Sequence, residues 1–182
     1  MKVTGGGSRH ALVLILGGTR SGKSRRAEEL ALGSGLAPVY LATGVAGDAE
    51  MESRIAAHRA RRGESWRTVE VPVELAAAIS RETRPDRILL VDCLTMWLTN
   101  LLMADMEVAT ACDRLEEALR DRRGPILLVS NEVGLGVVPA TPLSRRFLDH
   151  AGALHRRLAA LADRVELMVA GLPLALKPAA ER

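Results

Sequence analysis

The sequence has 182 residues, of which 48% are hydrophobic, enough to fill the core of one domain of ordinary size. Its net charge of +3 is the balance of 25 basic and 22 acidic residues, and only 2% of the residues are aromatic. So weak a charge with so few stacking side chains argues against a nucleic-acid-binding protein. No apolar stretch approaches the length needed to span a membrane, which argues against membrane insertion.

The two cysteines, Cys93 and Cys112, match no zinc-binding spacing and are expected to be free thiols in the cytoplasm. The N-terminal MKVTGGGSRH is polar and glycine-rich, and the apolar run after it leads into a glycine loop rather than a cleavage site. We therefore expect a disordered tail over residues 1–10, not a signal peptide, and a single domain over residues 11–182.

Predicted strands and helices alternate along the chain. Strands are expected at 11–16, 39–43, 67–71, 87–92, 125–130 and 164–170, and helices at 23–33, 48–62, 73–83, 107–123 and 143–162. The strands around 88–91 and 126–129 are continuously apolar, as in parallel sheets covered on both faces. This pattern predicts a three-layer α/β fold with a mostly parallel central sheet, in which ligands bind beyond the carboxyl ends of the strands.

The first predicted strand runs into a glycine loop with the P-loop pattern of a glycine, four free positions and Gly-Lys-Ser. The loop is Gly17-Gly18-Thr19-Arg20-Ser21-Gly22-Lys23-Ser24. Its glycines allow backbone N–H groups to point at an anion, and the following helix adds its positive end. Lys23 is expected to reach the β- and γ-phosphates of a nucleotide, and the Ser24 hydroxyl to ligate Mg²⁺. We therefore predict the P-loop NTPase fold.

Polar residues follow other predicted strands. Asp92 ends the strand at 87–92, where P-loop enzymes place a carboxylate that holds Mg²⁺, and the P-loop earlier in the chain favours this role over that of a turn residue. The segment 130–136, SNEVGLG, lies on the same edge, and its spacing is also compatible with an ordinary turn. Glu70 can accept hydrogen bonds from a ribose or a guanine, or can be a surface carboxylate at a strand end.

His58 lies among several arginines downstream of the second predicted strand, in the sequence RIAAHRARR. An imidazole amid guanidinium groups suits nucleophilic attack on a nucleotide phosphate. The arginines would bind the phosphate oxygens and would disfavour the imidazolium, which keeps the attacking nitrogen unprotonated. On the residues alone, a solvated helix that happens to carry a histidine is the favoured interpretation.

Several motifs in this order resemble the bifunctional adenosylcobinamide kinase/adenosylcobinamide-phosphate guanylyltransferases of cobalamin biosynthesis, and the likeness runs from about residue 11 to Lys177. The motifs are the P-loop, RIAAHR at 54–59, WRTVE at 66–70, LVDCLTMWLTNLL at 90–102 and SNEVGLGVVP at 130–139. The fold this resemblance implies is the three-layer P-loop NTPase fold of the RecA-like type.

The resemblance implies two reactions. In the first, GTP or ATP phosphorylates the hydroxyl of the aminopropanol arm of adenosylcobinamide. In the second, His58 attacks the α-phosphorus of GTP, expels pyrophosphate, and passes GMP to the phosphorylated corrinoid to give adenosylcobinamide-GDP. The implied catalytic residues are His58 and Lys23, with Mg²⁺ held by Ser24 and Asp92. Members of the family form homo-oligomers, and by analogy a trimer is expected here.

The nucleotide contacts that the resemblance implies extend beyond the P-loop. They are Ala42, Thr43 and Gly44 after the second strand, Arg59, Ala60, Arg61 and Arg62 after the histidine, and Glu70 and Asp92.

Some positions depart from the family pattern. Ala140-Thr141-Pro142 stands where a Glu-Asn pair is common, and His155-Arg156 where an Asn-Gln pair is common. Two other classes of protein also stay open. One is a P-loop small-molecule kinase with no guanylyltransferase step, and the other is a nucleotide-dependent binding or regulatory module.

Overall fold

The computed structural model describes residues 10–45, 63 and 65–178. Residues 1–9 of the predicted tail and the predicted helix at 48–62 lie outside the described residues. The strands are β1 (Leu12–Gly17), β2 (Ala37–Ala42), β3 (Arg67–Glu70), β4 (Arg87–Asp92), β5 (Ile126–Asn131), β6 (Arg164–Val169) and β7 (Leu172–Lys177). The helices are α1 (Lys23–Gly33), α3 (Leu75–Glu82), α4 (Leu94–Met103), α5 (Val108–Arg120) and α6 (Pro142–Leu161).

The strands form one seven-stranded sheet in the order β3-β2-β4-β5-β1-β6-β7. Neighbouring strands from β3 to β6 pair in parallel, and only β7 pairs antiparallel, with β6. The predicted, mostly parallel sheet is confirmed. Because β1 lies between β5 and β6, the loop that follows β1 opens near the middle of the carboxyl edge of the sheet.

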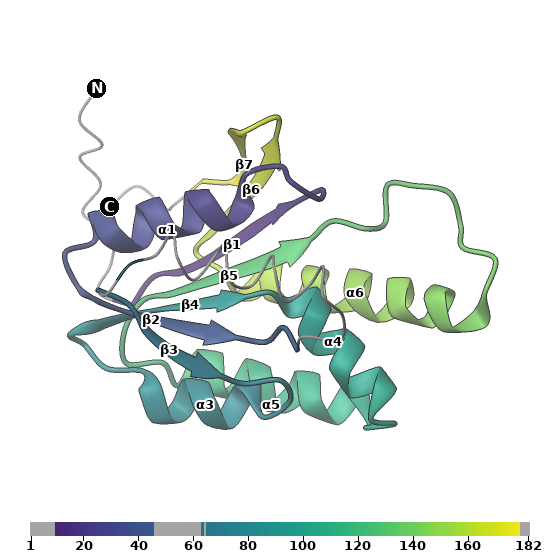
Figure 1. Cartoon of the computed structure of the whole chain (residues 1–182), viewed down its shortest axis with the longest axis horizontal. Coiled ribbons are helices and arrows are strands. Elements are labelled where there is room, and N and C mark those ends of the chain that lie inside the picture. The colour runs from purple at the N-terminus through teal and green to yellow at the C-terminus, as the bar shows by residue number, and fades with distance from the viewer. Residues whose placement is uncertain (1–9, 46–62, 64, 179–182) are drawn as a thin grey trace.

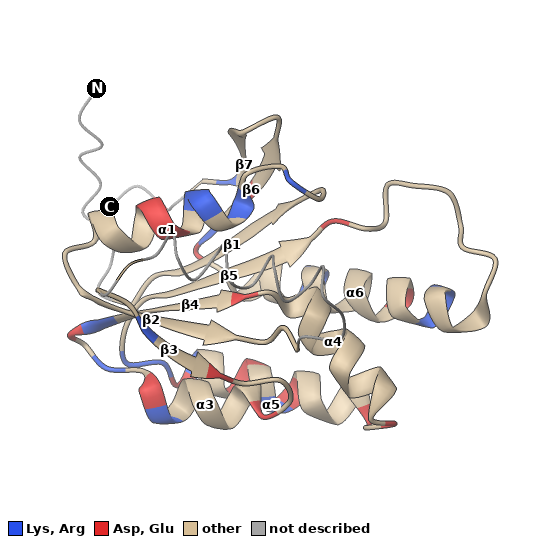
Figure 2. Ribbon diagram, in the orientation of Figure 1, with Lys and Arg blue, Asp and Glu red and all other residues tan. Residues whose placement is uncertain are grey.

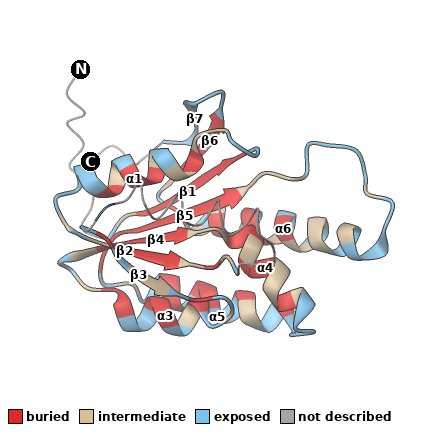
Figure 3. Ribbon diagram, in the orientation of Figure 1, coloured by how far each residue is buried: buried red, intermediate tan, exposed pale blue. Residues whose placement is uncertain are grey.

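Helix α1 covers one face of the sheet, and α3, α4, α5 and α6 cover the other (Figure 1). Alternate residues of β1 point to opposite faces of the sheet. Leu12 and Leu14 pack with residues of α3 to α6, whereas Val13 and Ile15 pack with Ala27 of α1. The central strands are therefore buried on both sides (Figure 3). This arrangement explains their continuously apolar sequences and confirms the predicted three layers.

Two elements were missing from the prediction. Helix α4, LTMWLTNLLM, has no charged residue and so shows no clear polar face with helical period, because it packs against β5, α5 and α6. Strand β7 contains Pro173 and is exposed along its whole length, so its sequence lacks the signal of a buried strand. No helix of the described chain is long and apolar enough to cross a membrane.

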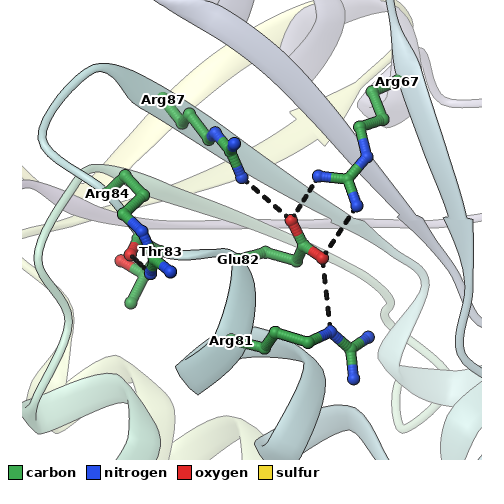
Figure 4. Close-up of polar contacts among 6 residues, drawn as sticks. All are labelled: Arg67, Arg81, Glu82, Thr83, Arg84 and Arg87. Carbon is green, nitrogen blue, oxygen red and sulfur yellow. Dashed lines mark hydrogen bonds and ion pairs between the residues drawn. The ribbon is translucent and has the colours of Figure 1, made fainter.

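A buried carboxylate fixes one end of the sheet. Glu82, at the end of α3, accepts hydrogen bonds from Arg67 of β3, Arg81 of α3 and Arg87 of β4 at 2.6–3.3 Å (Figure 4). Burial alone would raise the pKa of Glu82, but the hydrogen bonds from Arg67 and Arg81 outweigh it and hold the pKa below its usual value. This cluster lies at the opposite end of the strands from the P-loop and has a structural role.

Apart from Glu166 inside β6, the other charged residues of the described chain lie on the helices, in the loops and at strand ends (Figure 2). Figure 2 also shows acidic ribbon at the carboxyl ends of β3 and β4. The carboxyl edge of the sheet thus carries both the glycine loop and acidic side chains, as expected for a site that binds a nucleotide with a metal ion.

Candidate nucleotide site

The glycine loop connects β1 to α1, as the sequence predicts. Gly17 has φ 151°, and a Cβ there would lie 2.6 Å from the carbonyl oxygen of Met168. Gly22 precedes the first residue of α1 with φ 99°, a left-handed conformation that favours glycine. Both positions require glycine for reasons of backbone geometry, and the loop they shape ends at the positive N-terminus of α1.

Helix α1 is tied to β6 by a buried ion pair. Arg26 donates two hydrogen bonds of 3.1 Å to Glu166, whose side chain is 1% exposed, and Arg164 contacts the same carboxylate. The loop is therefore held on both sides: β1, before it, is paired with β5 and β6, and α1, after it, is bound to β6 through Arg26 and Glu166.

Lys23 is buried at the start of α1, and its Nζ donates a 2.6 Å hydrogen bond to the carbonyl oxygen of Gly18. Burial lowers the pKa of Lys23, while the nearby Asp92 and Cys93 act to raise it. Asp92, at the end of β4, lies on the same carboxyl edge of the sheet as the loop. An anion bound in the loop would give this ammonium group a stronger partner than a neutral carbonyl.

Ser21 carries an orphaned polar atom within the loop. Its Oγ is buried and has no hydrogen-bond partner in the described part of the chain. Buried hydroxyl groups are seldom left unpaired, and an oxygen-rich ligand in the loop would supply the missing partner. The Ser24 hydroxyl and the Asp92 carboxylate are hard oxygen donors, the type that Mg²⁺ prefers, so these residues fit the predicted metal ion.

The ends of β2 and β4 are joined through Thr43. The Thr43 hydroxyl donates to the Cys93 carbonyl at 2.7 Å and accepts from the Cys93 N–H at 2.8 Å. Asn100 of α4 donates to the Thr43 carbonyl at 2.8 Å and to the Pro72 carbonyl at 2.8 Å. The Thr43 side chain is fully buried, so its hydroxyl holds the peptide that follows Asp92. Sequence reasoning gave no role to Cys93 or Asn100.

A second set of polar contacts lies at the end of β5. Asn131 donates to the Thr95 hydroxyl at 3.0 Å, and the Glu132 N–H donates to the Gly17 carbonyl at 2.9 Å. Ser130 Oγ lies 2.7 Å from His155 Nε2, and both residues are buried. The segment 130–136 therefore connects the P-loop strand to α4 and α6. These contacts distinguish the segment from an ordinary turn. Their partners lie far away in the sequence, so sequence spacing did not reveal them.

The other predicted nucleotide contacts are distributed along the same edge. Gly18, Thr19 and Arg20 are exposed at the mouth of the loop, and Ala42 and Gly44 are half-buried at the end of β2. Glu70 is exposed at the end of β3, the edge strand farthest from β7. His58, Arg59, Ala60, Arg61 and Arg62 lie outside the described residues, so their roles stay predictions.

Comparison with known proteins decides the family. Residues 13–176 match the family described as cobinamide kinase / cobinamide phosphate guanyltransferase. The chain belongs to this family. The function expected from the resemblance is thereby confirmed at the level of the family: the protein is a bifunctional kinase and guanylyltransferase of cobalamin biosynthesis.

Curated relatives extend over nearly the whole chain. The bifunctional adenosylcobalamin biosynthesis protein CobP of Pseudomonas aeruginosa is 57% identical over 166 residues, which are 90% of this chain and 96% of that protein. The protein CobU of Salmonella typhimurium, of the same description, is 40% identical over 182 residues, with 91% of this chain and 99% of that protein covered. CobU of Escherichia coli is 36% identical over 181 residues, with the same coverage.

A more distant solved structure shares the fold. The flagellar accessory protein FlaH from Methanocaldococcus jannaschii matches with a TM-score of 0.56 at 14% sequence identity, covering 98% of this chain and 85% of that chain. The match supports the predicted RecA-like P-loop NTPase fold and carries no information on substrate.

The buried His155 gives the cobinamide kinase a pH-dependent stability. Burial lowers the pKa of His155, opposed by the carboxylate of Glu132. In the unfolded chain this histidine binds a proton near pH 6.5, whereas in the folded chain it does so only at a lower pH. The contribution of the neutral His155 to the free energy of unfolding is therefore complete above about pH 6.5 and is lost as the pH falls through the pKa of the folded state.

We therefore expect the free energy of unfolding to fall more steeply between about pH 7.5 and pH 5.5 in the wild type than in His155→Gln. Urea unfolding at the two pH values measures this difference. His150→Gln, on the same helix but half-exposed, is the control and should keep the wild-type slope. Parallel slopes for the wild type and His155→Gln would show that His155 does not contribute.

Proposed function

We propose that both reactions of this enzyme use the single nucleotide site formed by residues 17–24, with GTP or ATP as phosphoryl donor and GTP as guanylyl donor. The observation that carries the proposal is the buried Lys23 at the positive N-terminal end of α1, in a loop whose Ser21 hydroxyl has no hydrogen-bond partner among the described residues. A buried ammonium group and a hydroxyl group at a helix N-terminus suit the negatively charged phosphates of a bound triphosphate. The acceptor in the first reaction is the aminopropanol hydroxyl of adenosylcobinamide.

We propose that Ser24 and Asp92 hold Mg²⁺ at this site. When bound, the ion would neutralise charge on the phosphates of the nucleotide. Thr43 and Asn100 support this role, because Thr43 bonds to the N–H and carbonyl of Cys93, the residue after Asp92, and Asn100 holds Thr43 in place.

His58 is proposed as the nucleophile of the second reaction. Its imidazole nitrogen would bond to the α-phosphorus of GTP, the bond to the β-phosphate oxygen would break, and pyrophosphate would leave. Arg59, Arg61 and Arg62 would bind the phosphate oxygens, and Glu70 with the backbone of Ala42 and Gly44 would contact ribose or guanine. Ala42 ends β2, Gly44 follows shortly after it, and Glu70 ends β3. These strands lie one and two positions from β4 in the sheet, which supports the proposal for these three residues.

We also propose that the enzyme is a homo-oligomer, with a trimer as the expected form, and acts in the cytoplasm. The exposed edge strand β7 carries Leu172, Leu174 and Leu176, each at least 54% exposed, and an apolar edge of this kind is typical of a surface that another chain covers. The free thiols of Cys93 and Cys112 agree with a reducing compartment.

Exchange of labelled pyrophosphate into GTP tests the covalent route. Because attack by His58 is reversible and precedes binding of the corrinoid phosphate, exchange is expected with Mg²⁺ and GTP alone. If exchange requires the phosphorylated corrinoid, GMP passes directly from GTP to its acceptor and the histidine intermediate is wrong.

A substitution at Asp92 tests the metal site. Asp92→Asn should raise the Mg²⁺ concentration needed for half-maximal kinase rate by at least about tenfold, since losing a contact to a charged partner costs roughly 1.5–3 kcal/mol. The fold should persist, because Asp92 lies at a strand end and is half-buried. A magnesium titration measures the effect, with the exposed Asp86→Asn as the control. An unchanged titration curve would make Asp92 a turn residue.

A further inference from the structure

Among the described residues, three carboxylates lie at the ends of β3, β4 and β5 on the carboxyl edge of the sheet, and two of them already have proposed roles. Glu70 ends β3 and Asp92 ends β4, whereas Glu132 follows β5 directly. In the order of the sheet β5 is the neighbour of β1, the strand that carries the P-loop, and β4 and β3 lie progressively farther away. Glu132 is therefore the carboxylate on the strand next to the loop, and neither reaction described above uses it.

Glu132 is held firmly and stays accessible. Its N–H donates to the Gly17 carbonyl at 2.9 Å, which ties its backbone to the first residue of the loop. One carboxylate oxygen, Oε1, accepts a 2.6 Å hydrogen bond from the Gly134 N–H. The other, Oε2, lies 3.9 Å from His155 Nδ1, and the side chain is 22% exposed. One oxygen thus anchors the carboxylate while solvent or a substrate can reach the side chain.

His155 fixes this arrangement from α6. Its Nε2 is 2.7 Å from the hydroxyl of Ser130, which is fully buried, so the imidazole ring is attached on the side opposite Glu132. The chain continues from Glu132 into a loop with exposed apolar side chains, including Leu135 at 84% and Val137 at 94% exposure. A large acceptor substrate with apolar surface could rest on this loop beside the carboxylate.

The two reactions differ in their need for a proton acceptor. The acceptor in the kinase step is a neutral hydroxyl, which must lose its proton as its oxygen bonds to phosphorus. The acceptor in the guanylyl transfer is a phosphate oxygen that is already anionic. A carboxylate beside the acceptor hydroxyl would therefore assist the first reaction and be dispensable in the second.

We propose that Glu132 is the general base of the kinase step, an inference that rests on the proposed use of residues 17–24 by both reactions. The substrate hydroxyl gives its proton to the Glu132 carboxylate. Its oxygen bonds to the γ-phosphorus of the nucleotide, the bond from that phosphorus to the β-phosphate oxygen breaks, and a nucleoside diphosphate leaves. His155 and Gly134 are positioning residues that aim the carboxylate.

The experiment compares the two half-reactions of Glu132→Gln, which keeps the shape of the side chain and removes the basic oxygen. Its kinase kcat with adenosylcobinamide and GTP should fall by about 10²- to 10⁴-fold. Guanylyl transfer to supplied adenosylcobinamide phosphate, and exchange of pyrophosphate into GTP, should stay within about twofold of the wild-type rates. Glu117→Gln, an exposed position on α5, is the matched control and should change neither reaction.

A kinase rate close to that of the wild type would overturn the proposal. An equal fall in both reactions would also overturn it, because it would mean that the Glu132 side chain maintains a loop geometry that both reactions need and does not act in proton transfer. Should Glu132→Gln fail to fold, Glu132→Asp, which keeps the charge but shortens the side chain, should lower the kinase rate alone. Failure of the shared nucleotide site would be seen separately, as two reactions of the wild type that do not compete for GTP.

Discussion

Replacing Lys23 by alanine is expected to lower both the kinase and the guanylyltransferase rates by at least about 10²- to 10³-fold, the cost of removing one preorganised charge donor from a reacting group. The buried Lys23 belongs to the loop that we assign to both triphosphates, and its ammonium group donates to the Gly18 carbonyl. Rates for each half-reaction with purified Lys23→Ala measure the effect.

Arg25→Ala provides the matched control for this experiment. Arg25 lies on the same helix, its side chain is 78% exposed, and its partner is Glu29 on the helix surface. The control should retain both activities. Lys23→Ala protein that still phosphorylated adenosylcobinamide at a near-normal rate would refute the assignment of the loop.

Replacing His58 by alanine should abolish guanylyl transfer and leave at least part of the kinase activity. Phosphoryl transfer to a hydroxyl relies on positioning and charge neutralisation and needs no covalent intermediate on the protein, whereas the proposed GMP transfer cannot proceed without its nucleophile. Chromatography of the corrinoid products separates the two outcomes, because His58→Ala should accumulate adenosylcobinamide phosphate. His10→Ala, at an exposed position, should give the wild-type products. Formation of adenosylcobinamide-GDP by His58→Ala would exclude His58 as the nucleophile.

The sequence was sufficient to predict the parallel sheet and the P-loop because both depend on local patterns. The continuously apolar strands β4 and β5 reflect burial on two faces, and the loop glycines reflect conformations that other residues rarely adopt. Helix α4 was missed because burial removes the polar positions from which a helical period is recognised.

The polar contacts behind the site could not be predicted, since they join residues far apart in sequence. Thr43 bonds to Cys93 across 50 positions, and Ser130 to His155 across 25. In the sequence, His155 stands out only as a departure from the family pattern. Neither composition nor spacing indicates that its partner is a buried serine at the end of β5. Such contacts depend on the tertiary arrangement of strand ends and helices.

The central claim, that the enzyme carries GMP on His58 during the second reaction, is tested most directly by covalent labelling. Incubation with Mg²⁺ and GTP labelled at the α-phosphate should leave label on the protein, and label at the γ-phosphate should not remain. The bond should be acid-labile and base-stable, as expected for phosphorus on an imidazole nitrogen, and peptide mapping should place the label on His58. Label that persists in His58→Ala, or a wild-type protein that acquires none under turnover conditions, would contradict the claim.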